Sequence, residues 1–189
     1  NGVLKREQVT EYLKDLEQSE RKTLRDLGVK FGRYHVFLYQ LIKPEAVSLR
    51  TLLWKNFHQK FYNLKPPTFG LNFLEYKGTK NKNFMLLCGF EKFDNFFVRI
   101  DILERLFVLI INSSSKENNE IKLVPEMLNL LGCSKDNFKK LLQKMSYKVF
   151  EKQNETYFKY SPKNKFKKIS TKKISNENPF KILKNLKLG

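Results

Sequence analysis

The sequence has no run of about 18 apolar residues, the length that a membrane-spanning helix needs. Its longest candidate, residues 100–111, is interrupted by Asp101, Glu104 and Arg105. The first residues also lack the charged-then-apolar order of a secretory signal. We therefore expect a cytoplasmic protein without a membrane partner. The chain starts at Asn1 with no initiating methionine, which suggests a fragment of a longer polypeptide.

Cysteine and histidine are scarce, with two residues of each: Cys88, Cys133, His35 and His58. None of them forms a short C-x₂-C or H-x₃-H pair, so a zinc site would have to be assembled entirely by tertiary folding. We expect no metal and no Cys/His nucleophile. The cysteines are typical of reduced core residues in a cytosolic protein.

Acidic residues are also few, because 19 Asp and Glu face 37 Lys and Arg, which gives a net charge of +18. Such an excess favours a polyanionic partner, most often nucleic acid. Lys, Asn, Ile and Phe are abundant throughout, as in AT-rich coding sequences, so codon drift accounts for part of the lysine count. The partner we expect is RNA or single-stranded DNA, bound by a monomer.

What is present is enough apolar material for a core, at 41% hydrophobic and 14% aromatic residues. Periodicity predicts a helix over 5–27 that ends at Gly28, extended chain over 29–39, and a helix over 44–61 opened by Pro44. The last helix is apolar nearly all round, so we expect several neighbours to bury it, with Trp54 in the core rather than serving as a stacking platform. Residues 64–70, with two prolines, form a stiff connector.

Two strands, 85–90 and 96–100, are predicted to form a hairpin that turns near Asp94 and Asn95. Asp101 is then predicted to cap a helix over 102–111. We interpret Asp101 and Glu104 as capping and helix-dipole compensation rather than as a catalytic carboxylate pair, with Arg105 as a partner for one of them.

Residues 120–162 carry the most informative pattern. A short strand leads to a helix opened by Pro125, a turn at Gly132, a helix capped by Ser134, and two aromatic strands around Gln153 and Asn154. With the preceding helix, this is the element order of a winged helix-turn-helix. The second helix has an apolar stripe and a lysine stripe. The apolar stripe consists of Phe138, Leu141, Leu142 and Met145.

A helix of this kind packs on a core and presents cations to a phosphate backbone. The wing adds lysines and one aromatic side chain for base stacking, because strand alternation puts Tyr157 and Lys159 opposite Phe158 and Tyr160. Arg33, after Gly32, is a candidate phosphate contact on an exposed turn, although we favour a surface ion pair for it. The predicted binding residues are Lys135, Lys139, Lys140, Lys144, Lys148, Lys152, Tyr157, Lys159, Lys163, Lys165, Lys167, Lys168 and Arg33.

The predicted fold class is α+β and mostly helical. A helix-strand-helix portion (1–63) is followed by a connector (64–83), a winged-helix-like domain (84–162) and a basic, largely flexible tail (163–189). The tail has nine lysines against the single Glu177. It has too little apolar surface in its first half to order itself.

Four segments resemble one family. They are residues 27–38 (LGVKFGRYHVFL), residues 41–54 with the LIKPEA and LRTLLW runs, and the later pieces 98–105 and 127–134. Together they resemble the C-terminal region of bacterial superfamily-2 helicases related to the mitochondrial RNA-degradosome helicase. The resemblance spans about 24–160. It implies a non-catalytic accessory region that holds the strand behind an ATP-driven DExH-type motor in the same polypeptide.

The motor's own motifs are absent from these residues. There is no G-x-x-x-x-G-K-[ST] phosphate loop and no DExH box, so nothing here is expected to bind or hydrolyse ATP. ATP and magnesium are expected only in the missing motor. Two other interpretations stay open: a stand-alone winged-helix DNA-binding regulator, and a protein-docking module for which the charge is incidental.

Overall fold

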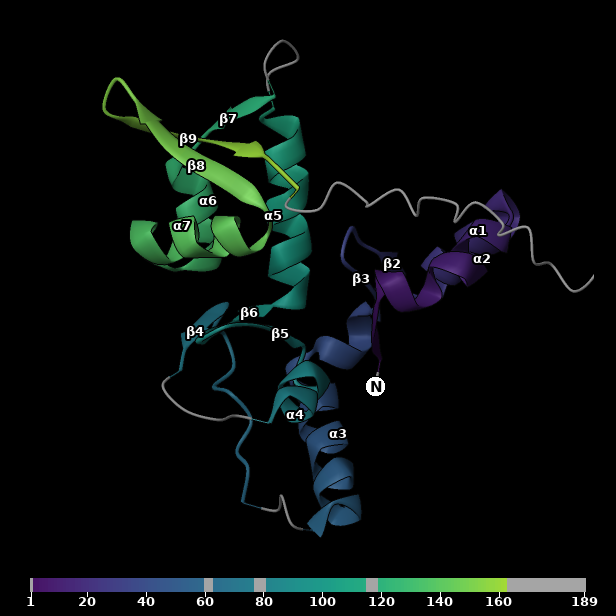
Figure 1. The fold of residues 1–189 in the computed structure, drawn as a ribbon. Helices are drawn as coiled ribbons and strands as arrows, with labels where there is room; N and C mark the ends of the chain where they lie inside the picture. Colours follow the sequence, from purple (N-terminus) through teal and green to yellow (C-terminus); the bar gives the residue numbers. More distant parts are fainter. Residues whose placement is uncertain (1, 60–62, 77–80, 115–118, 163–189) are drawn as a thin grey trace, which may run out of the picture.

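The fold is mixed α/β, about half helical, with three small antiparallel sheets (Figure 1). The computed structural model describes residues 2–59, 63–76, 81–114 and 119–162. The strand orders are β1-β3-β2 in sheet A, β4-β6-β5 in sheet B and β7-β9-β8 in sheet C. In each sheet, the middle strand is antiparallel to both of its neighbours.

The N-terminal segment begins with a strand that the sequence did not predict. Strand β1 (Val3–Lys5) is followed by a 3₁₀ turn (Arg6–Val9), α1 (Thr10–Asp15) and α2 (Gln18–Asp26). The prediction of one helix over 5–27 is therefore wrong at its start and across the break after Asp15. The break arises because the Glu17 backbone N–H donates to the Glu20 carboxylate at 2.8 Å, which starts a new helix.

Sheet A confirms the extended chain predicted after Gly28. Strands β2 (Val29–Phe31) and β3 (His35–Leu38) pair with each other, and β1 pairs with the other side of β3. A 3₁₀ turn, η2 (Tyr39–Ile42), leads from β3 to the next helix. The buried side chains of Val3, Phe37 and Ile100 form a small cluster that joins this sheet to the rest of the molecule.

Helix α3 (Pro44–Phe57) starts at Pro44 as predicted, but its expected burial is wrong. Only Val47 and Thr51 are buried. Trp54 is half-buried and packs against Phe84, with ring centroids 5.4 Å apart, so it lies at the edge of a core cluster as predicted. One side of the helix has no covering element among the described residues. It exposes the large apolar side chains of Leu49, Leu52, Leu53 and Phe57.

Residues 85–90 were predicted to be a strand, and this prediction is wrong: residues 85–87 are helical, 88 and 89 form a turn, and only Phe90 is in a strand. Strand β4 (Phe73–Glu75) is followed by α4 (Lys82–Leu87) and the hairpin of β5 (Phe90–Phe93) and β6 (Phe96–Arg99). The Asn81 side chain accepts from the backbone N–H groups of residues 83 and 84, which caps the helix. The apolar run was ambiguous between helix and strand, and this cap decides it. The predicted hairpin turn at Asp94 is confirmed.

Helix α5 (Ile100–Asn112) connects the two halves of the structure in Figure 1. Its N-cap is Arg99, so the predicted capping role of Asp101 is wrong. Asp101 instead accepts two hydrogen bonds from the Arg99 guanidinium, at 2.6 and 2.7 Å. The helix buries Leu103, Leu106 and Ile110 in the largest core cluster.

The C-terminal elements follow the predicted order: β7 (Glu120–Lys122), α6 (Pro125–Leu131), α7 (Lys135–Lys144), β8 (Tyr147–Lys152) and β9 (Glu155–Tyr160). Gly132 ends α6 with φ +67°, and the Ser134 side chain accepts from the Asn137 backbone N–H to cap α7. Gln153 and Asn154 both have positive φ in the β8–β9 turn. The sequence predictions for these caps and for the turn are confirmed.

The predicted division into domains remains a prediction. Strand β4 lies inside the predicted connector and pairs with β6 of the following region. The predicted tail, residues 163–189, lies outside the described residues. Across the described ranges, every helix is too short or too polar to cross a membrane.

Candidate nucleic-acid interface

The lysines of α7 fall into two groups. The buried face of the helix is the predicted one, with Phe138, Leu141 and Leu142 in the core. Lys135 and Lys140 are exposed, and no ion pair involves either of them within the described chain. Lys139 donates to Glu151 at 2.9 Å, and Lys144 pairs with Asp94. Two of the four predicted phosphate contacts on this helix are therefore already neutralised by carboxylates.

Sheet C has a buried face and an outer face, as strand alternation requires. The buried face packs Ile121 and Phe158 into the core. We use "outer face" for the opposite side of this sheet. Its members are Glu120 and Lys122 on β7, Lys148, Phe150 and Lys152 on β8, and Glu155, Tyr157 and Lys159 on β9.

Two aromatic rings lie side by side at the centre of the outer face. Phe150 is directly opposite Tyr157, with ring centroids 6.3 Å apart and planes inclined by 15°. The Tyr157 hydroxyl donates to Glu155 at 3.0 Å, which fixes the ring, and this hydrogen bond raises the pKa of Tyr157. Aromatic rings on a strand surface can stack unpaired bases. The Lys152 ammonium already lies over the Phe150 ring, 5.2 Å from its centroid.

The outer face has both cations in ion pairs and cations that form none among the described residues. Lys122 bonds Glu155, which lowers the pKa of that carboxyl, and Lys152 bonds Glu120 at 2.7 Å. Lys148 and Lys159 lie directly opposite each other on β8 and β9, and among the described residues neither has an ion-pair partner. Like charges in this position destabilise a sheet. Glu120 lies opposite Lys159 on its other side, but its carboxylate forms an ion pair with Lys152, so an anion from outside would relieve the repulsion between the two lysines.

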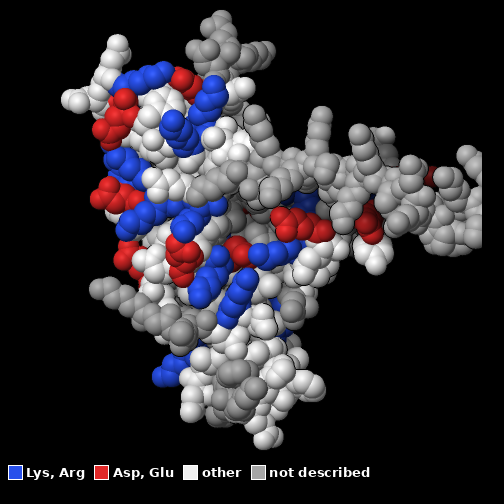
Figure 2. All heavy atoms as spheres, viewed as in Figure 1, with Lys and Arg blue, Asp and Glu red and all other residues white. Residues whose placement is uncertain are grey.

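Figure 2 shows that blue and red side chains are interleaved over the part of the molecule that carries sheet C and α7. The surface is therefore not uniformly basic in that view. Which lysines and arginines are available to a ligand therefore depends on whether each one already forms an ion pair.

A groove brings together three of the predicted residues from distant parts of the sequence. Arg33, Lys144 and Lys159 all line a cavity of about 520 Å³ between the β2–β3 turn, α5, the α7–β8 junction and the end of β9. We refer to it as the groove. Arg33 lies over the Phe107 ring, with its guanidinium carbon 5.7 Å from the centroid, so the predicted surface ion pair is replaced by a cation–π contact.

Sequence reasoning missed Phe150 and Lys122 on the outer face and the tyrosines of the groove. The alternation that placed Tyr157 also places Phe150 and Lys122, so that signal was available. The groove had no such signal, because its walls come from segments that only the tertiary fold brings together. Four predicted contacts, Lys163, Lys165, Lys167 and Lys168, lie outside the described residues.

A second charged site is buried and has a different character. Glu104 of α5 accepts from the backbone N–H groups of Arg33, Tyr34 and His35, at 2.5, 2.9 and 2.9 Å. The His35 ring lies between Glu104, at 3.2 Å, and Glu91, at 3.3 Å. We call Lys5, His35, Glu91 and Glu104 the buried charge cluster.

Hydrogen bonds set the protonation of this cluster. Burial lowers the pKa of His35, but its hydrogen bonds to Glu104 and Glu91 outweigh that effect, so the pKa of His35 is raised. Burial raises the pKa of Glu91, but the hydrogen bonds from His35 and Lys5 outweigh it, so the pKa of Glu91 is lowered. Every charge here has an opposite partner, and Gly32 leaves room for the carboxylate of Glu104. The arrangement fixes the β2–β3 turn on α5.

Glu104 was predicted to compensate the helix dipole, and this prediction is wrong. Its carboxylate points away from its own helix and accepts hydrogen bonds from the β2–β3 turn. No ion pair joins Arg105 to either predicted carboxylate in the described part of the chain; Asp101 is held by Arg99.

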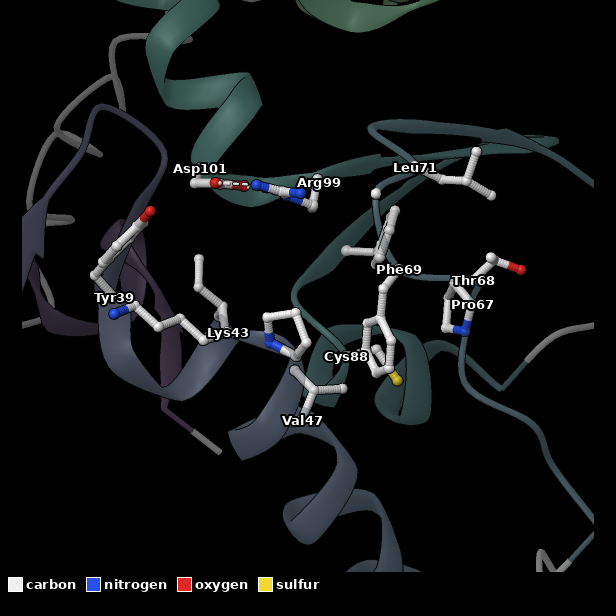
Figure 3. Close-up of a pocket in the computed structure, with 14 residues that line it drawn as sticks. Tyr39, Lys43, Val47, Pro67, Thr68, Phe69, Leu71, Cys88, Arg99 and Asp101 are labelled. Atoms are coloured by element: carbon white, nitrogen blue, oxygen red, sulfur yellow. Dashed lines mark hydrogen bonds and ion pairs between the residues drawn. The ribbon is translucent and has the colours of Figure 1, made fainter.

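Figure 3 shows a smaller pocket of about 110 Å³ between η2, the start of α3 and residues 67–71. Its Arg99 guanidinium is directed at Asp101, and its Lys43 ammonium lies 5.7 Å from the centre of the Tyr39 ring. Because these cations are already engaged and the volume is small, the pocket offers less to a ligand than the groove.

Within the described ranges, no three His, Cys, Asp or Glu residues are grouped so that they could hold a metal ion. Cys88 is buried and Cys133 is half-buried. Burial raises the pKa of the Cys133 thiol to about 11, which keeps it protonated at neutral pH.

Comparison of the chain with protein-family models, with curated proteins and with solved structures finds no match.

Proposed function

We propose that this chain is a non-catalytic nucleic-acid-binding region that holds RNA or single-stranded DNA on the outer face of sheet C. One observation carries the proposal: Lys148 and Lys159 lie opposite each other, beside the nearly parallel rings of Phe150 and Tyr157, and neither forms an ion pair among the described residues. A phosphate between the two ammonium groups removes their repulsion. The neighbouring rings then stack the bases of an unpaired strand.

The order of elements supports a winged-helix-like arrangement as part of the same proposal. Three helices, α5, α6 and α7, come before the hairpin, and sheet C has the order β7-β9-β8. In such a domain α7 would be the recognition helix. Because Lys139 and Lys144 are already in ion pairs, we assign the main contact to the sheet rather than to α7.

We further propose that the chain belongs to the C-terminal part of an ATP-dependent helicase. The support is the resemblance of residues 27–54, 98–105 and 127–134. In this role the chain holds the strand while motor domains in the same polypeptide hydrolyse ATP. Reading the complete open reading frame for helicase motifs before Asn1 tests this part separately.

Charge reversal of Lys148 and Lys159 to Glu tests the binding proposal. Fluorescence anisotropy with a labelled single-stranded oligonucleotide should show at least a tenfold loss of affinity. Lys14 and Lys22 are exposed on α1 and α2 and give a matched control, because changing both to Glu alters the net charge equally. Equal losses in the two double variants would show that only net charge matters, and the assignment to sheet C would be wrong.

A protein-docking role is the second candidate, and one observation favours it. Helix α3 exposes Leu49, Leu52, Leu53 and Phe57, with fractions from 53% to 84%. A continuous apolar stripe of this kind marks an interaction surface. If Leu53→Asp abolished association with the motor domains while oligonucleotide affinity stayed unchanged, the chain would have separate docking and strand-holding surfaces.

A further inference from the structure

The groove has the size and shape of a ligand site. Its volume of about 520 Å³ falls in the range of roughly 300–1,000 Å³ that is typical of small-molecule sites. Five segments form its walls: the β2–β3 turn, the C-terminal half of α5, residues 119–121 at the start of β7, the α7–β8 junction and the end of β9. The groove is thus large enough for one nucleotide but too small for a folded partner.

The charge of the groove selects an anion. Its cations are Arg33, Lys144 and Lys159, and no Asp or Glu is among the described residues that line it. Lys144 has an ion-pair partner, the largely exposed Asp94, whereas no carboxylate pairs with the side chains of Arg33 or Lys159 in the described ranges. Phosphate is the anion that Arg, Lys and hydroxyl donors recognise together.

Arg33 is held in place by the buried charge cluster. Glu104 accepts from the backbone N–H groups of Arg33 and Tyr34, so the turn cannot move without breaking these partly buried hydrogen bonds. The Phe107 ring supports the guanidinium from below. A cation on a fixed turn loses less conformational entropy on binding than one on a flexible loop.

Aromatic side chains supply the second half of a nucleotide site. Tyr160 is 50% exposed and contacts Tyr147 edge to face, with ring centroids 5.3 Å apart. Burial raises the pKa of Tyr147 and of Tyr34, so both hydroxyls remain hydrogen-bond donors at neutral pH. An exposed ring fixed by its neighbour is suited to stacking a base.

We propose that the groove is a subsite for one nucleotide of a single strand, with its phosphate held by Arg33 and Lys159 and its base against Tyr160. The inference rests on the proposed function, because Lys159 lines the groove and also belongs to the outer face. A strand on the outer face therefore continues into the groove past Lys159. The site would tie strand binding to the β2–β3 turn, which lies far from sheet C in the sequence.

The test uses the full chain, a labelled single-stranded RNA of about 12 nucleotides, and the variants Arg33→Gln and Tyr160→Ala. Each should weaken binding about fivefold to tenfold, and Arg33→Gln should reduce the slope of log K against log salt by about 0.7, the value for one phosphate contact on a single strand. Arg25→Gln is the matched control, because Arg25 makes a similar contact over Phe31, at 5.8 Å, away from the groove.

Ultraviolet cross-linking with 5-iodouridine in the RNA provides a readout that does not depend on the variants folding. Mass spectrometry of the wild-type adduct should locate a cross-link on Tyr160. If Lys148→Gln weakens binding while Arg33→Gln behaves like Arg25→Gln and Tyr160 is not cross-linked, the subsite is wrong and the proposed function stands. If the wild-type chain binds no oligonucleotide, both are wrong. Protection of Tyr160 by free uridine monophosphate at the oligonucleotide's working concentration would assign the groove to free nucleotides and contradict the proposal.

Discussion

The buried charge cluster and the outer face of sheet C are both rich in charge, but they differ in how the charges are satisfied. In the cluster, His35 lies between Glu91 and Glu104, Lys5 bonds Glu91, and three backbone N–H groups donate to Glu104. On the outer face, Lys148 and Lys159 oppose each other, and neither forms an ion pair in the described part of the chain.

This difference in charge pairing indicates which charged residues stabilise the fold and which are available to bind a ligand. Charges that find opposite partners inside the protein hold elements together, and removing one partner leaves the other buried and uncompensated. Lys148 and Lys159 face each other at the surface and form no ion pair among the described residues, so an anion from outside can neutralise them. We therefore expect changes in the cluster to lower stability, and changes on the outer face to lower affinity without lowering stability.

The largest effect should come from Glu104→Gln. The amide keeps the shape of the side chain but places donors against three backbone N–H groups and His35, so we expect a loss of about 3 kcal/mol in the free energy of unfolding. Urea denaturation followed by circular dichroism measures it. Glu7→Gln, at an exposed position, is the control and should cost less than about 0.5 kcal/mol. A loss below about 1 kcal/mol for Glu104→Gln would show that the cluster does not hold the turn.

Lys148→Glu should separate stability from binding. The new carboxylate lies opposite Lys159, so the free energy of unfolding should rise by a few tenths of a kcal/mol. Affinity for a single strand should fall about tenfold, or about 1.4 kcal/mol, because one phosphate contact becomes repulsive. Thermal melting and anisotropy on the same preparation measure the two quantities, with Lys14→Glu as the control. If the free energy of unfolding and the affinity both fell, Lys148 would have a structural role like the residues of the buried charge cluster and would not be a ligand contact alone.

The pH dependence of stability should report the cluster alone. The raised pKa of His35 means that its contribution is fully present below about pH 6.5 and is lost as pH rises through the raised pKa. Glu91 acts oppositely: its pKa is lowered, so its contribution is present above about pH 4.5 and is lost as pH falls through the lowered value.

Urea unfolding between pH 5 and pH 8 should therefore show stability declining above about pH 6.5. His35→Gln should remove this decline, and His58→Gln should retain it. If both variants keep the decline, another group than His35 is responsible.

The smallest effect should come from Lys139→Gln on α7. Its ion pair with Glu151 is exposed, so stability should change by less than about 0.5 kcal/mol. Affinity should change less than twofold, because the lysine is already neutralised. A tenfold loss of affinity would show that α7 is the main nucleic-acid contact, and the emphasis on sheet C would then be wrong.

Local signals in the sequence predicted much of the C-terminal half. Pro125, Gly132 and Ser134 act within one helical turn of their own positions, so their effects are readable without tertiary information. The strand after Gln153 follows from alternation. The apolar run after Asn83 was misread because a short helix and a buried strand have the same composition.

The remaining features depend on contacts between distant residues. Glu104 and the N–H groups that it accepts are separated by about 70 positions, and no local pattern predicts such a pairing. The groove is likewise visible only after Arg33 and Lys159 have been brought together by the fold. The exposure of α3 was also not predicted, because the apolar composition of a helix does not show how many other elements will pack against it.

The most direct test of the account is the salt dependence of single-strand binding. Neutralising about six phosphates on a single strand gives a slope of roughly −4 for log K against log salt. We expect that slope for the wild-type chain in an anisotropy titration, and a slope of smaller magnitude for the variant with Lys148 and Lys159 changed to Glu. A slope near zero for the wild-type chain would contradict the proposed function.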